Sequence, residues 1–224
     1  MCQGLHRRAV AAVRSGPGQN PFREPLRAMH LETHLTIALP PGAEPELRAW
    51  AVRRGVKVLC IELVRGVAPR QVMLTLHSGT SVVEARQHAE ALAFEALSTC
   101  GARRCRLKVE AQWSQGPFAV SAPVYLEHHV RVATRDLEAL GQLAASQAAH
   151  LSRSAYKVSP DGVQERFLTQ RFGPSDDAAM GAAFDSLLAR LADAGLPVTK
   201  VERERVLFDD NIALDEGWLE ETSR

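Results

Sequence analysis

The chain has 224 residues, of which 46% are hydrophobic and 24% charged, proportions typical of a globular protein with a sizeable core. Its apolar runs are shorter than the roughly 18 residues needed to cross a bilayer, so we expect no membrane association and a cytoplasmic location. Residues 1–28 hold five arginines and one glutamate, which leaves a mildly acidic body of 22 basic and 25 acidic residues, an unfavourable balance for nucleic acid binding.

The first segment, residues 1–28, contains three prolines and several glycines and has no sustained apolar periodicity. Because so little apolar surface is available for burial, we expect a disordered basic tail. Met29 stands directly before the first strand-like segment, which favours a plain tail or an early start site over an organelle transit peptide.

From residue 30 the apolar pattern predicts the order strand, helix, strand, strand, helix, strand. The predicted elements are strand 30–38, helix 44–54, strands 57–63 and 70–77, helix 81–100 and strand 104–111. Ser81 and Glu84 form a capping box at the start of the second helix, and Gly101 marks its end. The apolar residues that indicate this helix are Val83, Ala91, Phe94 and Leu97.

From residue 125 the same order of elements recurs. The predicted elements are strand 125–133, helix 135–147 capped by Thr134, strands 149–158 and 164–172, helix 176–194 and strand 197–208. Matched residues lie 94 or 95 positions apart, namely Glu32 and Glu127, His34 and His129, Thr75 and Thr169, Gly101 and Gly195, Glu110 and Glu204. Agreement in both order and spacing predicts an internal duplication.

We therefore predict an α+β fold: a tandem duplication of a ferredoxin-like βαββαβ unit, with antiparallel sheets that carry helices on one face. The predicted repeats are residues 29–113 and 125–208, joined by a linker at 114–124. Residues 209–224 form an acidic tail, and we expect Trp218 to pack it onto the body. In the strand order 4-1-3-2 of such a unit, the first strand lies inside the sheet.

Strand alternation sorts the side chains of each predicted sheet by face. Leu31, Leu35 and Ile37 belong under the helices, which leaves Glu32 and His34 on the open face. The same parity places further polar residues on the two open faces: His30, Lys108, Glu110, Tyr125, Glu127, His129, Arg171, Lys200, Glu202 and Glu204. Each half therefore presents glutamate and histidine beside basic residues.

This doubled pattern suggests that the two open faces turn toward one another around a polar cleft. The candidate catalytic residues are Glu32, His34, Glu127 and His129. The candidate ligand-binding residues are His30, Lys108, Glu110, Tyr125, Arg171, Lys200, Glu202 and Glu204. The competing interpretation is a solvated sheet face that alternates charges. Histidine at matched positions of both halves favours the site, because solubility requires charge but no particular residue.

Three classes of function fit these residues. One is an enzyme that acts on an anionic or phosphorylated small molecule, with Glu and His as acid and base and with Lys or Arg as anion clamps. The others are a ligand sensor and a protein-interaction module. A divalent metal would need ligands from both halves or from adjacent strands, because His30 and His34 lie about 13 Å apart along one strand. The sequence leaves open whether the chain is an enzyme and whether it binds a metal.

Overall fold

The computed structural model describes residues 31–77, 81–113, 122–156 and 162–218. The predictions made for residues 1–28, for His30, for most of the linker and for the last six residues lie outside this part of the chain. Within it, no helix is long and apolar enough to span a membrane.

The structure is α+β, with antiparallel pairing between all neighbouring strands. The first half contains β1 (Leu31–Ala38), α1 (Glu44–Arg54), β2 (Lys57–Leu63), β3 (Arg70–His77), α2 (Val82–Cys100) and β4 (Arg103–Gln112). The second half contains β5 (Tyr125–Thr134), α3 (Leu137–Ser146), β6 (His150–Ser154), β7 (Gln164–Phe172), α4 (Asp177–Asp193) and β8 (Val198–Asp209). A short 3-10 helix, η2 (Ile212–Asp215), follows β8.

Helix ends follow local sequence signals, with one correction. Ser81 caps α2 by accepting a hydrogen bond from the backbone N–H of Glu84 at 3.2 Å, and Gly101 ends the helix with φ of 69°. Helix α3 is capped by Asp136, which accepts from the N–H of Ala139 at 2.9 Å, and not by Thr134 as predicted. The Thr134 hydroxyl instead accepts from the N–H of Asp136, so it orients the residue that caps the helix.

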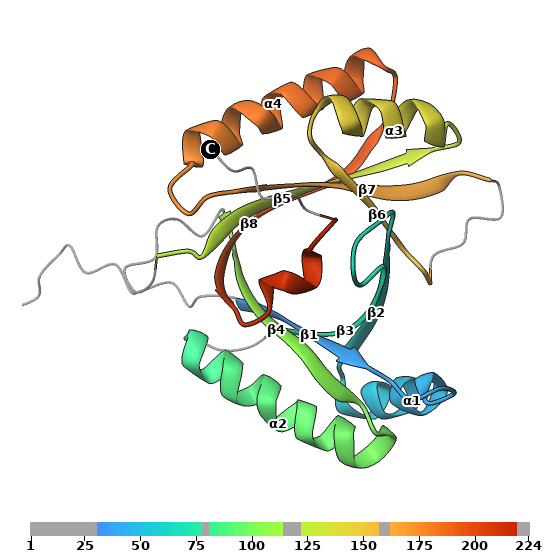
Figure 1. Ribbon diagram of the computed structural model, residues 1–224, viewed down its shortest axis with the longest axis vertical. Coiled ribbons are helices and arrows are strands. Elements are labelled where there is room, and N and C mark those ends of the chain that lie inside the picture. Colours follow the sequence, from blue (N-terminus) through green and yellow to red (C-terminus); the bar gives the residue numbers. More distant parts are fainter. Residues whose placement is uncertain (1–30, 78–80, 114–121, 157–161, 219–224) are drawn as a thin grey trace, which may run out of the picture.

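The eight strands close into a barrel in the order β1-β3-β2-β6-β7-β5-β8-β4. Within each half the order is fourth, first, third, second strand, and the halves join edge to edge through the pairs β2–β6 and β4–β8. Helices α1 and α2 cover one side of the barrel, and α3 and α4 cover the opposite side (Figure 1). The helix-free face of each half therefore forms the interior of the barrel. The sequence predicted two sheets but not their closure into one.

Each half has its own apolar core between its sheet and its helix pair. Leu35, Leu74 and Leu107 are fully buried in the first half, and Val130 and Leu168 in the second. Helix α2 packs through small residues and one leucine: Ala85, Ala89, Leu92, Ala93, Ala96 and Cys100. The larger residues that indicated this helix lie on its other side, with Val83 61%, Phe94 71% and Leu97 52% exposed. The alanine face lets α2 approach the sheet closely.

His128 lies in this apolar layer, because its parity on β5 is opposite to that of Glu127 and His129. Its Nε2–H donates to the amide oxygen of Gln170 at 2.5 Å, and its ring contacts Phe172 and Phe184 at centroid distances of 5.6 and 5.2 Å. Burial disfavours the charged ring and lowers the pKa of His128 to about 4. The neutral imidazole is therefore a core residue of the second half.

We predict that His128 makes the protein sensitive to mild acid. The unfolded chain takes up a proton near pH 6.5 but the folded chain does so only near pH 4, so stability falls as the pH drops through this window. Between pH 7 and pH 4.5, the free energy of unfolding should fall by about 2 kcal/mol less in His128→Gln than in the unaltered protein, as measured by urea unfolding at both pH values. His88→Gln, at an exposed histidine of α2, is the control and should behave like the unaltered protein. An unchanged pH dependence in His128→Gln would contradict the prediction.

Candidate functional site

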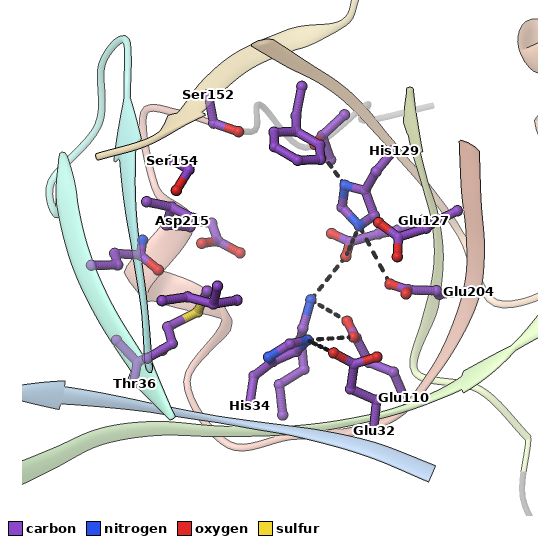
Figure 2. Close-up of a pocket in the computed structure, with 18 of the residues that line it drawn as sticks. Glu32, His34, Thr36, Glu110, Glu127, His129, Ser152, Ser154, Glu204 and Asp215 are labelled. Carbon is purple, nitrogen blue, oxygen red and sulfur yellow. Dashed lines mark hydrogen bonds and ion pairs between the residues drawn. The ribbon is translucent and has the colours of Figure 1, made fainter. Parts of the chain in front are cut away.

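The two helix-free faces enclose a cavity of about 290 Å³ inside the barrel. Side chains from all eight strands line it, together with Asp215 and Trp218 from the segment after β8. Figure 2 shows the side chains of the two halves pointing toward one another across this space. The volume is at the small end of the range for ligand pockets, about 300 Å³ and above.

Most of the sequence-predicted site residues line this cavity. They are Glu32, His34, Lys108, Glu110, Glu127, His129, Arg171, Lys200, Glu202 and Glu204. Tyr125 is buried beside it, where its hydroxyl donates to Asp209 at 2.5 Å and its ring lies 4.1 Å from the guanidinium of Arg171. Lys200 is at the mouth, half exposed and paired with Glu202. His30 lies outside the described residues.

One group of side chains, the His34 cluster (Glu32, His34 and Glu110), comes from β1 and β4. Thr75 on β3 contacts Nδ1 of His34 through its hydroxyl at 3.1 Å, which fixes the ring orientation. Nε2 of His34 then lies 3.0 Å from Glu110 Oε2 and 3.6 Å from Glu32 Oε1. These three side chains appear in the lower part of Figure 2.

The His129 cluster (Glu127, His129 and Glu204) repeats this arrangement in the second half, on β5 and β8. The Thr169 hydroxyl on β7 contacts Nδ1 of His129 at 2.8 Å. Nε2 of His129 lies 3.6 Å from Glu127 Oε2 and 3.4 Å from Glu204 Oε2. Thr75 and Thr169 occupy matched positions, so the same strand neighbour orients the histidine in both halves.

Lys108 lies between the two clusters, where its ammonium group contacts Glu110 and also Glu127 at 3.1 Å. Arg171 binds the other oxygen of Glu127 at 2.8 Å through Nε. The lining as a whole nevertheless carries as many lysines and arginines as carboxylates. Among the described lining residues, the carboxylates are Glu32, Glu110, Glu127, Glu202, Glu204 and Asp215, and the cations are Lys57, Arg106, Lys108, Arg131, Arg171 and Lys200. Lys108 and Arg171, which contact the two clusters, are already paired with carboxylates.

The buried charges shift one another's pKa. Burial opposes protonation of His129, but hydrogen bonds to Glu127 and Glu204 outweigh it and raise the pKa of His129 to about 10. Burial also opposes ionisation of Glu127, yet Lys108 and Arg171 hold the pKa of Glu127 well below its ordinary value. Burial and the nearby Glu110 raise the pKa of Glu204. At neutral pH, His129 is therefore a cation and Glu127 an anion.

The opposite wall of the cavity is largely apolar, and sequence reasoning missed it. Its apolar residues are Leu59, Ile61, Met73, Phe167 and Trp218, beside the uncharged polar side chains of Gln71, Ser152 and Ser154. A signal was present in β2, because the run Lys57–Leu63 carries apolar residues at both parities instead of alternating. Such a run indicates a strand buried on both faces. The cavity thus has an ionised wall and an apolar wall.

Arg106 and Asp215, neither of which was among the predicted site residues, fasten the C-terminal segment across the barrel. Arg106 on β4 donates through Nη1 to Asp215 at 2.9 Å and through Nη2 to the Tyr125 hydroxyl at 3.0 Å. Asp215 accepts from Arg171 on β7 at 2.6 Å, so its carboxylate bridges the two halves of the chain. Trp218 anchors the segment by donating from its indole N–H to the carbonyl of Leu151 at 3.2 Å.

Comparisons with known proteins do not assign the chain to a family. No protein-family model matches it, and no curated protein does. The regulatory subunit of aspartate kinase from Thermus thermophilus is 16% identical, with a TM-score of 0.33 over 73% of this chain and 93% of that one. The acetolactate synthase small subunit from Thermotoga maritima is 14% identical, with a TM-score of 0.29 over 80% and 94%. A heme-binding protein, also from Thermus thermophilus, is 13% identical, with a TM-score of 0.26 over 80% and 92%. Similarities this low assign neither a fold nor a function.

We predict that Asp215→Asn destabilises the protein by about 2 kcal/mol, because it removes one of the two carboxylates that each of the guanidinium groups of Arg106 and Arg171 contacts in a buried setting. Urea unfolding at pH 7 measures this loss. Asp185→Asn, at an exposed aspartate on α4, is the matched control and should change stability by less than about 0.5 kcal/mol. Equal effects of the two substitutions would show that the bridge does not hold the barrel together.

Proposed function

We propose that the interior of the barrel is the binding site of one small molecule. Its apolar part would contact the wall formed by Leu59, Ile61, Met73, Phe167 and Trp218, and its polar head would contact the His34 and His129 clusters. The observation that carries this proposal is the convergence of both open faces on one cavity. An apolar lining with a few convergent polar groups is the usual composition of a ligand pocket.

Burial supports a binding site over a solubilising surface. The side chains of Glu110 and Glu127 are each 2% exposed, and that of Glu204 is 8% exposed. Carboxylates that only kept a sheet face hydrated would lie in water, where ionisation costs least. The same closure removes these faces from contact with another protein, which weighs against the interaction module considered from the sequence.

The charge balance informs which head group the cavity would accept. The sequence favoured an anionic or phosphorylated molecule bound by Lys108 and Arg171, and that remains a prediction. Both cations already contact carboxylates, so an anion would have to compete with Glu110, Glu127 and Asp215 for them. We propose instead a head group that brings positive charge or hydrogen-bond donors to the carboxylates of the His34 and His129 clusters.

One observation favours an enzyme as a second candidate. A proton-transfer group works best when its pKa lies near the working pH, and the pKa of Glu204 is raised toward neutral pH. The pKa values of Glu127 and His129 are shifted away from the working pH, so these two groups would act as fixed charges. In this second candidate Glu204 would take the proton from a bound molecule, and Glu204→Gln would lower turnover far more than it weakens binding.

We also propose that the chain arose by tandem duplication of a ferredoxin-like unit, with repeats at 29–113 and 125–208 and a linker at 114–124. A repeated irregularity supports this origin. The pairing of β1 with β4 shifts register between Thr36 and Ile37, and that of β5 with β8 shifts between Arg131 and Val132, 95 residues later. Bulges tend to be retained within families, so a bulge at matched positions adds to the support that the matched residues give to a duplication.

A cytoplasmic location stays a prediction.

The binding proposal predicts a ligand-dependent rise in melting temperature. A thermal-shift panel should pair apolar bodies with heads of both charges: primary amines, carboxylates, nucleotides and sugar phosphates. At least one class should stabilise the full chain, since a ligand that binds only the folded state raises its stability. Glu127→Gln and His129→Ala, which alter the polar wall, should remove that stabilisation.

A cavity-filling variant separates interior binding from surface binding. Leu59→Trp places a larger side chain in the cavity and should abolish the shift, whereas Val64→Trp, at a residue that is 71% exposed near the end of β2, should retain it. If no class in the panel stabilises the protein, or if Leu59→Trp responds like Val64→Trp, the proposal is wrong.

A further inference from the structure

We propose that the His129 cluster binds a divalent transition-metal ion such as Mn²⁺ or Zn²⁺. The inference deepens the proposed function, on which it rests, by naming the positive charge that the carboxylates of the His129 cluster would accept. The ligands would be Nε2 of His129 and one carboxylate oxygen each from Glu127 and Glu204. Imidazole nitrogen with carboxylate oxygen is a donor set for first-row divalent ions.

The geometry of the His129 cluster fits one ion. The three candidate ligand atoms lie within 4.8 Å of one another. Nε2 of His129 is 3.6 Å from Glu127 Oε2 and 3.4 Å from Glu204 Oε2. Ligands placed about 2.1 Å from a tetrahedral ion are separated by about 3.4 Å, so the two histidine-to-carboxylate spacings already match, and binding would draw the two carboxylate oxygens, which lie within 4.8 Å, closer together. Glu127 Oε2 also accepts from Lys108 at 3.1 Å, and a carboxylate oxygen has lone pairs for both partners.

A neighbouring group orients the proposed histidine ligand. The Thr169 hydroxyl lies 2.8 Å from Nδ1 of His129, which leaves Nε2 directed at the two carboxylates. Metal-binding histidines commonly use their second nitrogen in such a contact, which sets the tautomer and the ring orientation. The His129 side chain is 20% exposed and lines the cavity, so the cluster is open to an ion from that side.

The difference between the two halves points to the His129 cluster and away from the His34 cluster. Lys108 on β4 lies opposite His34 in the strand register, and its ammonium contacts Glu110 of the His34 cluster as well as Glu127 of the His129 cluster, so the two clusters differ at Glu204 and at the register position of Lys108. Glu202 on β8 lies opposite His129 at the matched position. Among the described residues, no lysine or arginine forms an ion pair with Glu204, whose partner is His129. The first half therefore carries its own cation where the second half carries another carboxylate.

Metal titration of the full chain, after treatment with a chelator and its removal, tests the proposal. Co²⁺ should develop the visible absorption of a protein-bound ion, and Mn²⁺ should lose the electron paramagnetic resonance signal of the free ion, each at one ion per chain. His129→Gln and Glu204→Gln should weaken binding at least about tenfold. His34→Gln changes the matched histidine of the first half and should bind the ion within about threefold of the unaltered protein.

Glu202→Lys is a second test that retains all three proposed ligands. It introduces a lysine at the position of the second half that matches Lys108 in the first half. The Glu202 side chain is 23% exposed, so the substitution should preserve folding. The new ammonium should occupy the acidic cluster and suppress metal binding, with the melting temperature unchanged or raised. Absence of stoichiometric binding by the unaltered protein overturns the metal site, as does equal loss in His34→Gln and His129→Gln. Neither result affects the Leu59→Trp test, which uses small molecules without metal.

Discussion

Closure of the barrel is the constraint on which the rest of the structure depends, because it buries the charged faces of both halves. Carboxylates removed from water are costly unless positive charge lies beside them. Lys108 and Arg171 supply part of that charge inside the barrel, and protons on His34 and His129, whose pKa values are raised, supply more. An ion at the His129 cluster would take the place of one such proton. The charged residues of the site and the ion pairs that join the two halves thus form one electrostatic network.

Strand alternation and repeat spacing were sufficient to predict most elements and the polar face of each sheet. They worked because the pleat has a period of two and one face of each sheet is uniformly apolar. The helix predicted over 81–100 is present as α2, but the large apolar residues taken as its signal are exposed: small residues such as Ala89 form the buried face, while Phe94 points to solvent. A search for large apolar side chains misses the buried face of a helix that packs closely through alanine. It also missed His128, since one neutral histidine in an apolar strand face gives no periodic signal.

Sequence patterns could not predict contacts that depend on closure. Arg106, Asp215 and Trp218 are far apart in the chain or lie in the tail, and they meet only because β4 pairs with β8 and the segment after β8 crosses the barrel. The apolar wall depends on the seam between β2 and β6, which comprises three residue pairs around Glu62 and Arg153. The histidine and glutamate positions were predictable because the same pattern occurs twice in the sequence, 95 residues apart.

Shared charges also link ligand binding to the stability of the barrel. Glu127 contacts Lys108 from the first half and Arg171 from the second, and Arg171 in turn holds Asp215 of the C-terminal segment. A cation beside Glu127 would compete with Lys108 and Arg171 for that carboxylate, where these ion pairs meet. It would also weaken the hold of Glu127 on Arg171, which could then bind Asp215 more strongly. Binding in the cavity should therefore strengthen the attachment of the C-terminal segment that crosses the barrel. Occupancy of the interior then affects the end of the barrel where this segment lies.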